Sequence, residues 1–341
     1  MVGKKISITS IAKHLGISTT TVSFVLNGKA QEKRISDKLV KKVMDYVEEI
    51  DYKPNSLARS LRTGKSNIIA LIVEDISFPF FSAIAKEIEE KAYKNGYRII
   101  YSSTENDAAK TRELIEIYQD KHVDGYIIVP PEGVEEKINA LRLSGKPVVV
   151  LDRYLDNVET DHVLVNNYDS VYSATQYLID QGYKNIAFIT LSSLQSQMLD
   201  RLSGYEQAIQ DNNLRPIIKE ITPVDSLERE KHLLSFLERK RNNIEAIIFS
   251  TNYICVSGLK AMKQLGLNIP EDIAVVSFDD YELFEMYTPA ITSIAQPIES
   301  ISENAINLLL SRLNKRTADV DKSAQKIVLP TTFIPRDSSG H

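Results

Sequence analysis

The chain has 341 residues and a mass of 38.5 kDa, which allows two or three domains, and its 43% apolar and 26% charged residues exclude a globally disordered protein. The single cysteine, Cys255, excludes a framework of disulfide bonds within the chain. The five histidines form no HExxH motif and give no support to a metal site, so we expect no metal and no cofactor. No apolar run approaches the ~20 residues of a membrane span and no secretory signal is visible, so we expect a cytoplasmic protein with no membrane partner.

Charge is distributed unevenly along the chain. Residues 1–66 hold 13 basic and 6 acidic residues, a net charge of +7. Because the whole chain carries −5, the remaining 275 residues carry −12. A small basic head on an acidic body indicates that the head binds a polyanion and the body does not.

The basic head has the pattern of three helices joined by short turns. Ser7 can cap a helix whose apolar residues recur at i, i+3, i+4 and i+7 until Gly16 ends it. Ser18 can cap a second helix, and a third begins near residue 36. The second helix begins with three short polar side chains, those of Thr19, Thr20 and Thr21. This layout is typical of a helix-turn-helix, whose second helix enters the major groove of DNA, although a three-helix bundle for protein contacts has the same pattern.

Two segments of the head carry a specific resemblance. Residues 7–18, SITSIAKHLGIS, and residues 21–28, TVSFVLNG, closely resemble the headpiece of the LacI/GalR family of bacterial transcription regulators. The similarity continues through YKPN at 52–55 and ARSL at 58–61, and reaches IPRDS at 334–338. It therefore covers essentially the whole chain, and it implies a helix-turn-helix headpiece at residues 1–53 and a hinge at residues 54–66.

The resemblance implies roles for the second helix of the headpiece. Base edges are read at the positions of Thr19 and Thr20. Phosphates are contacted, or the helix is held in place, at the positions of Ser18, Thr21, Ser23 and Asn27. Phe24 departs from the family, which often has an arginine there that can bind guanine with two hydrogen bonds. Phe24 can touch a thymine methyl or pack within the headpiece, so the operator base at that position stays open.

The hinge is expected to be a conditional helix. Residues 55–62 are too few for a helix that is stable alone, since isolated helices need about 12–15 residues, so the segment requires a partner to order it. The resemblance implies that Leu61 is an apolar wedge that enters the minor groove of DNA. Asn55, Ala58 and Arg62 belong to the same implied DNA contact. Without the resemblance, a plain interdomain linker would be the simpler interpretation.

The body reads as a repeated strand–helix unit, which indicates parallel sheets with helices on both faces. Strands are expected at residues 68–73, 97–101, 126–129, 147–151, 186–190, 217–221, 246–250 and 274–278. Helices are expected at residues 81–95, 108–121, 134–144, 170–181, 200–212, 227–240 and 256–265. The predicted fold is therefore an all-α helix-turn-helix headpiece with a hinge helix, followed by an α/β body of two doubly wound parallel-sheet subdomains.

Polar and aromatic residues collect where the predicted strands end, which is where doubly wound sheets bind ligands. Charged and amide groups there can pair with vicinal hydroxyls while aromatic faces stack on sugar rings, although any single residue could instead cap a helix or form an ion pair. The residues in question are Phe80, Phe81, Asp152, Arg153, Arg201, Asn252 and Asp279.

The body is similar to periplasmic sugar-binding proteins and to the effector domain of the same regulators. This resemblance places Asp152, Arg153, Arg201, Asn252, Asp279 and Gln296 in a cleft between two subdomains. The subdomains are expected roughly at residues 67–165 with 293–326, and at residues 166–292 with 327–341. Phe78 and Tyr253 depart from the family, since many relatives have an asparagine and an acid at those two places, so the effector's identity stays open.

The sequence thus predicts a DNA-binding transcriptional regulator, a repressor, that binds a near-palindromic operator as a homodimer under the control of a sugar or sugar phosphate. We expect no enzyme, because GxGxxG, GxxxxGK[ST] and GxSxG motifs are absent. The alternative is a cytoplasmic sugar-binding or sugar-processing protein whose N-terminal helices serve another role. Whether the effector induces or co-represses, and which operator is bound, are not encoded in any local pattern.

Overall fold

The computed structural model describes residues 7–52, 64–222, 225–314 and 323–340. The chain divides into two compact units, Met1–Ser66 and Asn67–His341. The expected hinge residues Asn55, Ala58, Leu61 and Arg62 lie outside the described residues. Within the described ranges, no helix is both long and apolar enough to cross a membrane.

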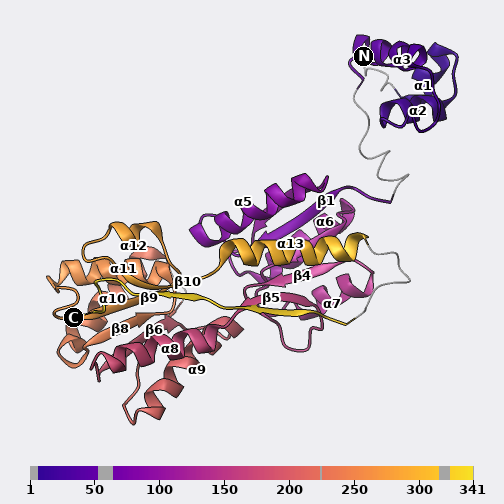
Figure 1. The fold of residues 1–341 in the computed structure, drawn as a ribbon. Coiled ribbons are helices and arrows are strands. Elements are labelled where there is room, and N and C mark those ends of the chain that lie inside the picture. The colour runs from indigo at the N-terminus through magenta and orange to yellow at the C-terminus, as the bar shows by residue number, and fades with distance from the viewer. Residues whose placement is uncertain (1–6, 53–63, 223–224, 315–322, 341) are drawn as a thin grey trace. The chain divides into compact units, whose positions relative to one another are not determined.

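The headpiece consists of the helices α1 (Ile8–Leu15), α2 (Thr19–Leu26) and α3 (Asp37–Glu49), as the sequence predicts (Figure 1). Gly16 has φ 68°, a left-handed conformation that glycine adopts at little cost, and this lets the chain turn from α1 into α2. The helices share a small core of Ile11, Ala12, Val22, Val25 and Val43.

The first lobe of the body is built on a parallel six-stranded sheet in the order β11-β5-β4-β3-β1-β2. Its strands are β1 (Ile68–Val73), β2 (Arg98–Ser103), β3 (Gly125–Ile128), β4 (Val148–Leu151), β5 (Asp161–Val165) and β11 (Lys326–Leu329). One face is covered by α5 (Pro79–Lys94) and α13 (Ile298–Asn314), which lie side by side in Figure 1, and the other by α6 (Ala108–Asp120) and α7 (Glu135–Leu143).

Alternate residues of β1 explain this layering. Ile69 and Leu71 belong to the core beneath α5 and α13, whereas Ala70 and Ile72 belong to the core beneath α6 and α7. Because successive strand residues point to opposite faces, a strand covered on both sides must be apolar at every position, as this one is.

The second lobe repeats the arrangement with the strand order β12-β10-β9-β8-β6-β7. Its strands are β6 (Ile186–Leu191), β7 (Ile217–Ile221), β8 (Ala246–Phe249), β9 (Ala274–Phe278), β10 (Thr292–Ala295) and β12 (Thr332–Ile334), and only β12 is antiparallel to its neighbour. Its helices are α8 (Asn167–Asp180), α9 (Ser196–Asp211), α10 (Ser226–Lys240), α11 (Asn252–Gln264) and α12 (Glu282–Met286), with a short 3-10 turn η1 (Arg241–Asn243).

Three segments carry the chain between the lobes, and two of them differ from the expected boundaries. The sequence places residues 293–326 in the first subdomain and 327–341 in the second, but β10 pairs with β9 in the second sheet and β11 pairs with β5 in the first. The crossings therefore lie at residue 166, after residue 295 and after residue 329. Hydrogen bonds tie the first and third crossings together, since Thr331 N donates to Asn166 Oδ1 at 2.9 Å and Asn166 N donates to Leu329 O at 3.1 Å.

The strand β5 is absent from the sequence-based prediction because it begins with two polar residues, Asp161 and His162. Both are buried, and Asp161 accepts hydrogen bonds from Arg312 of α13 at 2.8 Å and 2.7 Å. A buried carboxylate is tolerated when a cation pairs with it. Here the cation lies 151 residues away in the chain, so no local pattern could reveal it.

Candidate functional site

The first turn of α2 presents the residues expected to contact DNA. Ser18 caps the helix, since its Oγ accepts a hydrogen bond from Thr21 N at 3.0 Å. Thr19 and Thr20 are exposed at this turn, so their short side chains are free to approach a groove. At the other end of the helix Asn27 is exposed, and its amide donates to Ser23 O at 2.6 Å.

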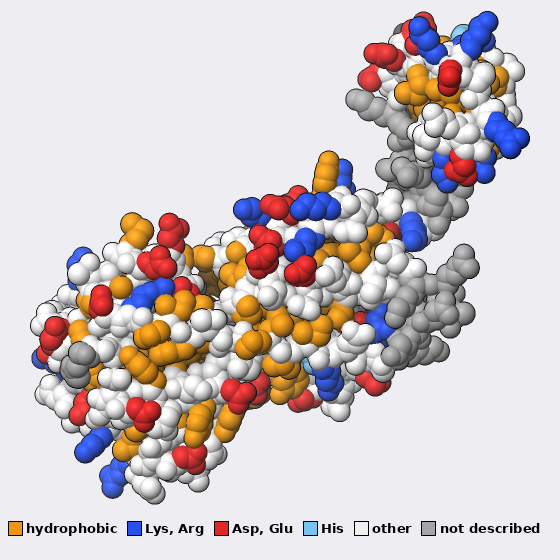
Figure 2. All heavy atoms as spheres, in the orientation of Figure 1, with side chains coloured by type: hydrophobic (Ala, Val, Ile, Leu, Met, Phe, Trp, Pro, Cys, Tyr) orange, Lys and Arg blue, Asp and Glu red, His pale blue; other side chains and the backbone are white. Residues whose placement is uncertain are grey.

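Ser23 and Phe24 differ in accessibility from these exposed positions. Ser23 is only 6% exposed and lies against Asn27, so its position fits a residue that holds the helix end rather than one that reaches a phosphate. Phe24 is half-buried, and Nζ of Lys33 lies 5.6 Å from the centre of its ring. Packing within the headpiece therefore buries part of the Phe24 side chain. Figure 2 shows Lys and Arg side chains on the surface of this unit.

The body has a cavity between its lobes, which we call the inner cavity, with a volume of about 40 Å³. All eight residues that the sequence suggests for effector binding line it: Phe80, Phe81, Asp152, Arg153, Arg201, Asn252, Asp279 and Gln296. The cavity lies at the carboxyl ends of strands of both sheets, where the doubly wound topology predicts a ligand site. The structure thus brings together side chains that are up to 216 residues apart in the sequence, from Phe80 to Gln296.

Arg153 is held by carboxylates. It is 2% exposed, its Nη2 donates to Glu74 Oε2 at 2.6 Å, and its Nε donates to Asp152 Oδ2 at 3.2 Å. Its Nη1 donates to Asn106 Oδ1 at 2.9 Å. Burial acts to lower the pKa of Arg153, but the Asp152 and Glu74 carboxylates outweigh it and leave the pKa raised. The positive charge of this guanidinium is therefore balanced by the two carboxylates, and the group is hydrogen-bonded without any ligand.

Arg201 is buried, and its hydrogen-bond partners are neutral, although the Asp279 and Asp152 carboxylates act to raise its pKa. It is 2% exposed, and it donates from Nε to Asn167 Oδ1 at 2.8 Å and from Nη1 to Ser250 O at 2.7 Å. Its guanidinium lies 3.5 Å from the centre of the Phe278 ring. Burial lowers its pKa, and among the described residues Nη2 has no hydrogen bond to protein. Of the two arginines, Arg201 is the one with a donor to offer a ligand.

Asp279 faces the same cavity from the end of β9. Burial raises its pKa above the ordinary range, against the opposing effects of Arg201 and of the Gln296 amide, whose Nε2 donates to Asp279 Oδ1 at 2.6 Å. Its φ of 67° is in the left-handed region, where Asp and Asn are better tolerated than other residues with a Cβ. Its second carboxylate oxygen can accept from a ligand hydroxyl, which would stabilise the charged form that burial disfavours.

The two departures from the family pattern contact each other. The ring of Phe78, from the first lobe, stacks on that of Tyr253, from the second, with centroids 5.1 Å apart and planes 9° apart. Arg229 lies on Tyr253 as well, with its guanidinium carbon 4.8 Å from the ring centre. The stack forms one wall of the inner cavity and joins the two lobes.

The inner cavity also contains residues absent from the sequence-based list. These are Glu74, Phe78, Gln195, Gln197, Met198, Thr251 and Tyr253. Glu74 directly follows β1, so the strand-end rule that selects Asp152 and Asp279 could have found it. Gln195, Gln197 and Met198 were hidden because α9 is predicted to start at residue 200, whereas it starts at Ser196.

An enzyme-like nucleophile is not evident at Cys255. The thiol is buried in the second lobe, and burial raises its pKa to about 12, so the reactive thiolate is disfavoured. Among the residues described, no group of three His, Cys, Asp or Glu side chains is arranged to hold a metal ion.

Comparisons with known proteins agree with this organisation. Residues 7–55 match the model for bacterial regulatory proteins of the lacI family, and residues 175–339 match that for a periplasmic binding protein-like domain. The chain is 30% identical over 316 residues to the HTH-type transcriptional repressor PurR of Aliivibrio fischeri, covering 91% of this chain and 92% of that protein. It is 28% identical over 336 residues to the ribose operon repressor of Halalkalibacterium halodurans, covering 98% and 97%.

The fold is also that of a solved structure, the Lac repressor dimer bound to operator and the anti-inducer ONPF. The two share a TM-score of 0.84 over 99% of this chain and 100% of that one, at 21% identity. At that identity the likeness concerns the fold alone.

Proposed function

Because this chain belongs to the LacI family of bacterial regulatory proteins, we propose that it is a sequence-specific transcriptional repressor whose operator binding is controlled by a small neutral sugar held between the lobes of its body. The observation that carries the proposal is the pairing, in one chain, of an exposed Thr19–Thr20 turn on a basic headpiece with an interlobe cavity lined by charged and aromatic side chains. We place this activity in the cytoplasm, where operator DNA is found.

The charges of the inner cavity favour a neutral ligand over a sugar phosphate. Its lining includes the carboxylates of Glu74, Asp152 and Asp279 but only two guanidinium groups. Since Arg153 is already paired with Glu74 and Asp152, a phosphate would meet one available cation, Arg201, beside an acid, Asp279. Hydroxyl groups instead can donate to the carboxylates and accept from Arg201 and the amides.

The protein is proposed to bind its operator as a homodimer, with one headpiece on each half of a near-palindromic site. In this arrangement the first turn of α2 enters the major groove, and the helix dipole and Ser18 cap face the phosphates. The alternative function, a sugar-binding protein whose N-terminal helices serve another role, does not explain why exposed threonines begin the second helix of a basic unit.

Replacement of Thr20 by alanine is expected to weaken binding to the operator and relax base preference at one position. The exposed side chain lies where base edges would be read, and one mismatched base pair in a site typically costs about 1–3 kcal/mol. Gel-shift titration of the full-length protein against operator and single-base variants measures the effect. Thr9→Ala, at an exposed position of α1, is the matched control. Equal operator affinity for wild type and Thr20→Ala, with unchanged base preference, would contradict this role.

Replacement of Leu61 by alanine is expected to weaken operator binding much more than non-specific binding. The proposed wedge acts only where the DNA is kinked, at a cost of a few kcal/mol per unstacked step that extra contacts offset. Parallel titrations with operator and random duplex measure the ratio. Hydrogen exchange on residues 55–62, with and without operator, tests the folding step: amides already protected in free protein would rule out a hinge that folds on DNA.

A further inference from the structure

The ring of Phe24 carries a cation from the loop that follows α2. Nζ of Lys33 lies 5.6 Å from the centre of this ring, within the roughly 6 Å over which an ammonium group is attracted to an aromatic face. The Lys33 side chain is 43% exposed, so its ammonium group is accessible from solution. Phe24 stands where the family often has an arginine, and Lys33 therefore returns a positive charge to that position.

Backbone hydrogen bonds order the loop so that Lys33 reaches the ring. Lys29 N donates to Phe24 O at 2.9 Å, and Lys33 N donates to Lys29 O at 3.1 Å, so the chain makes one further turn directly after α2. Ile35 N donates to Ala30 O at 2.8 Å, and both of these side chains pack against the headpiece core. Lys33 is therefore held near α2 by the backbone as well as by the ring contact.

Phe24 and Thr20 lie on the same side of α2, because residues four apart in a helix lie one above the other. Another side of the helix carries Val22 and Val25, which are buried in the headpiece core. In the proposed complex Thr20 faces the base edges. The Phe24 ring and the Lys33 ammonium group then face the major groove about one helical turn further along α2.

The neighbour of Lys33 favours a base pair over a phosphate as its partner. Glu32 Oε1 lies 3.1 Å from Lys33 Nζ, and an exposed pair of this kind contributes little stability that DNA binding would have to replace. A phosphate would be repelled by the Glu32 carboxylate. A G·C pair instead presents the N7 and O6 acceptors of guanine beside the N4 donor of cytosine, which match an ammonium group and a carboxylate.

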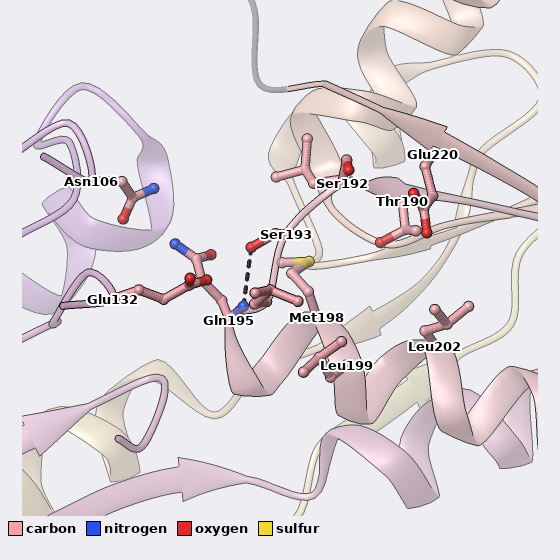
Figure 3. Close-up of a pocket in the computed structure, with 12 residues that line it drawn as sticks. Asn106, Glu132, Thr190, Ser192, Ser193, Gln195, Met198, Leu199, Leu202 and Glu220 are labelled. Atoms are coloured by element: carbon pink, nitrogen blue, oxygen red, sulfur yellow. Dashed lines mark hydrogen bonds between the residues drawn. The ribbon is translucent and has the colours of Figure 1, made fainter. Parts of the chain in front are cut away.

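The open space between the lobes of the body does not supply a cation to DNA. It is a cavity of about 500 Å³ whose lining residues include the carboxylates of Glu132 and Glu220 and no lysine or arginine (Figure 3). The residues after 66 carry a net charge of −12, which repels DNA as well. A cation that reads a base beside Thr20 therefore comes from the headpiece itself.

We infer that Lys33, seated on the Phe24 ring, donates hydrogen bonds to the guanine of a G·C pair next to the base pair that Thr20 contacts, and that Glu32 accepts one from the amino group of the paired cytosine. This inference rests on the proposed operator binding and adds one specified base pair to it. The position of Phe24 then reads guanine through a lysine of the following loop and not through a side chain of α2.

Base-pair scanning of the operator with the full-length protein tests the inference. The wild-type protein selects its operator from random-sequence DNA, each base pair is changed to the other three in both half-sites, and fluorescence anisotropy gives the affinities. Wild type is expected to prefer G·C at one position by at least about fivefold, the lower end of what one good base contact provides. Lys33→Ala is expected to bring that ratio to about one, and Lys33→Arg to keep it.

Three further variants separate the parts of this contact. Lys42→Ala, at an exposed position of α3, is the matched control and is expected to leave the G·C preference intact. Phe24→Leu removes the ring but keeps an apolar side chain, and it is expected to lower the preference by about two- to fivefold, the contribution of one exposed cation–ring contact. Glu32→Ala is expected to lower the preference too, whereas a carboxylate that only repels phosphates would, on removal, raise the affinity for every sequence.

A loss of affinity in Lys33→Ala that is equal for every sequence would assign Lys33 to a phosphate and overturn the inference. A selected operator without a G·C preference, or a preference unchanged in Lys33→Ala, would overturn it as well. These outcomes leave operator binding intact, whereas failure of the wild-type protein to select any sequence would contradict the proposed function too. Affinity for a random duplex at low salt verifies that the headpiece of each variant is folded.

Discussion

Raising the salt concentration from 50 to 200 mM is expected to weaken operator binding by about 10³–10⁵-fold, if each dimer neutralises about 6–10 phosphates. The expectation follows from the +7 charge of residues 1–66, since each DNA-bound cation releases a condensed counterion. The remaining residues carry −12, so they add repulsion and not affinity. Fluorescence anisotropy with a labelled duplex, selected from random-sequence DNA by the full-length protein, measures the slope.

A fragment of residues 67–341 is the control for the salt experiment, because this unit is compact on its own. It is expected to show no DNA binding at any salt concentration. An affinity that does not change with salt, or DNA binding by the fragment equal to that of the full chain, would favour the alternative in which the N-terminal helices serve another role.

Replacement of Asp279 by asparagine is expected to reduce effector affinity at least about 30-fold and to leave operator binding by effector-free protein nearly intact. The loss of one charged hydrogen-bonding partner in a desolvated site costs about 2–5 kcal/mol. Asparagine is the suitable replacement because it tolerates the φ of 67° at this position, where alanine would add backbone strain. Loss of affinity can then be assigned to the carboxylate.

Arg201→Met extends the same test to the cation. Methionine retains an unbranched apolar side chain beside Phe278 while removing the donor that faces the cavity. Asp169→Asn, at an exposed position of α8, is the control. Calorimetry with the tightest-binding saccharide gives the affinities, and anisotropy gives the effector's influence on DNA binding. Unchanged effector affinity in both site variants, or a nucleobase as the tightest ligand, would contradict the assignment of this cavity to a sugar.

Much of the candidate site follows from a single topological rule. Parallel strands of one sheet end at the same edge, so Asp152 and Asp279 can be assigned to a cleft from the strands that precede them. The rule does not say which charged groups pair. Arg153 and Arg201 look equivalent in the sequence, but Glu74 and Asp152 engage the first and leave the second with neutral partners.

The misplaced crossings have a similar cause. The strands β10 and β11 are both four residues long and only partly apolar; β10 lies inside its sheet between β9 and β12, and β11 lies at an edge of its own. Which sheet each one joins depends on pairing with β9 or β5, which lie far away in the sequence. Local periodicity predicts neither segment as a strand, and it cannot say which sheet either one joins. The stack of Phe78 on Tyr253 is non-local in the same way, since each residue alone reads as an unexplained substitution.

The route of the chain has a consequence for how the protein is synthesised. The ribosome releases the N-terminal residues first, and the five core residues of the headpiece all lie within the first 43. The first lobe, by contrast, needs α13 to cover one face of its sheet and β11 to complete the sheet's edge beyond β5. Until α13 is translated, α5 alone covers that face of the sheet, so part of its apolar surface stays exposed while the second lobe is translated. A chain that stops before residue 298 keeps five strands of that sheet but lacks α13, and apolar surface left exposed in this way is prone to aggregation.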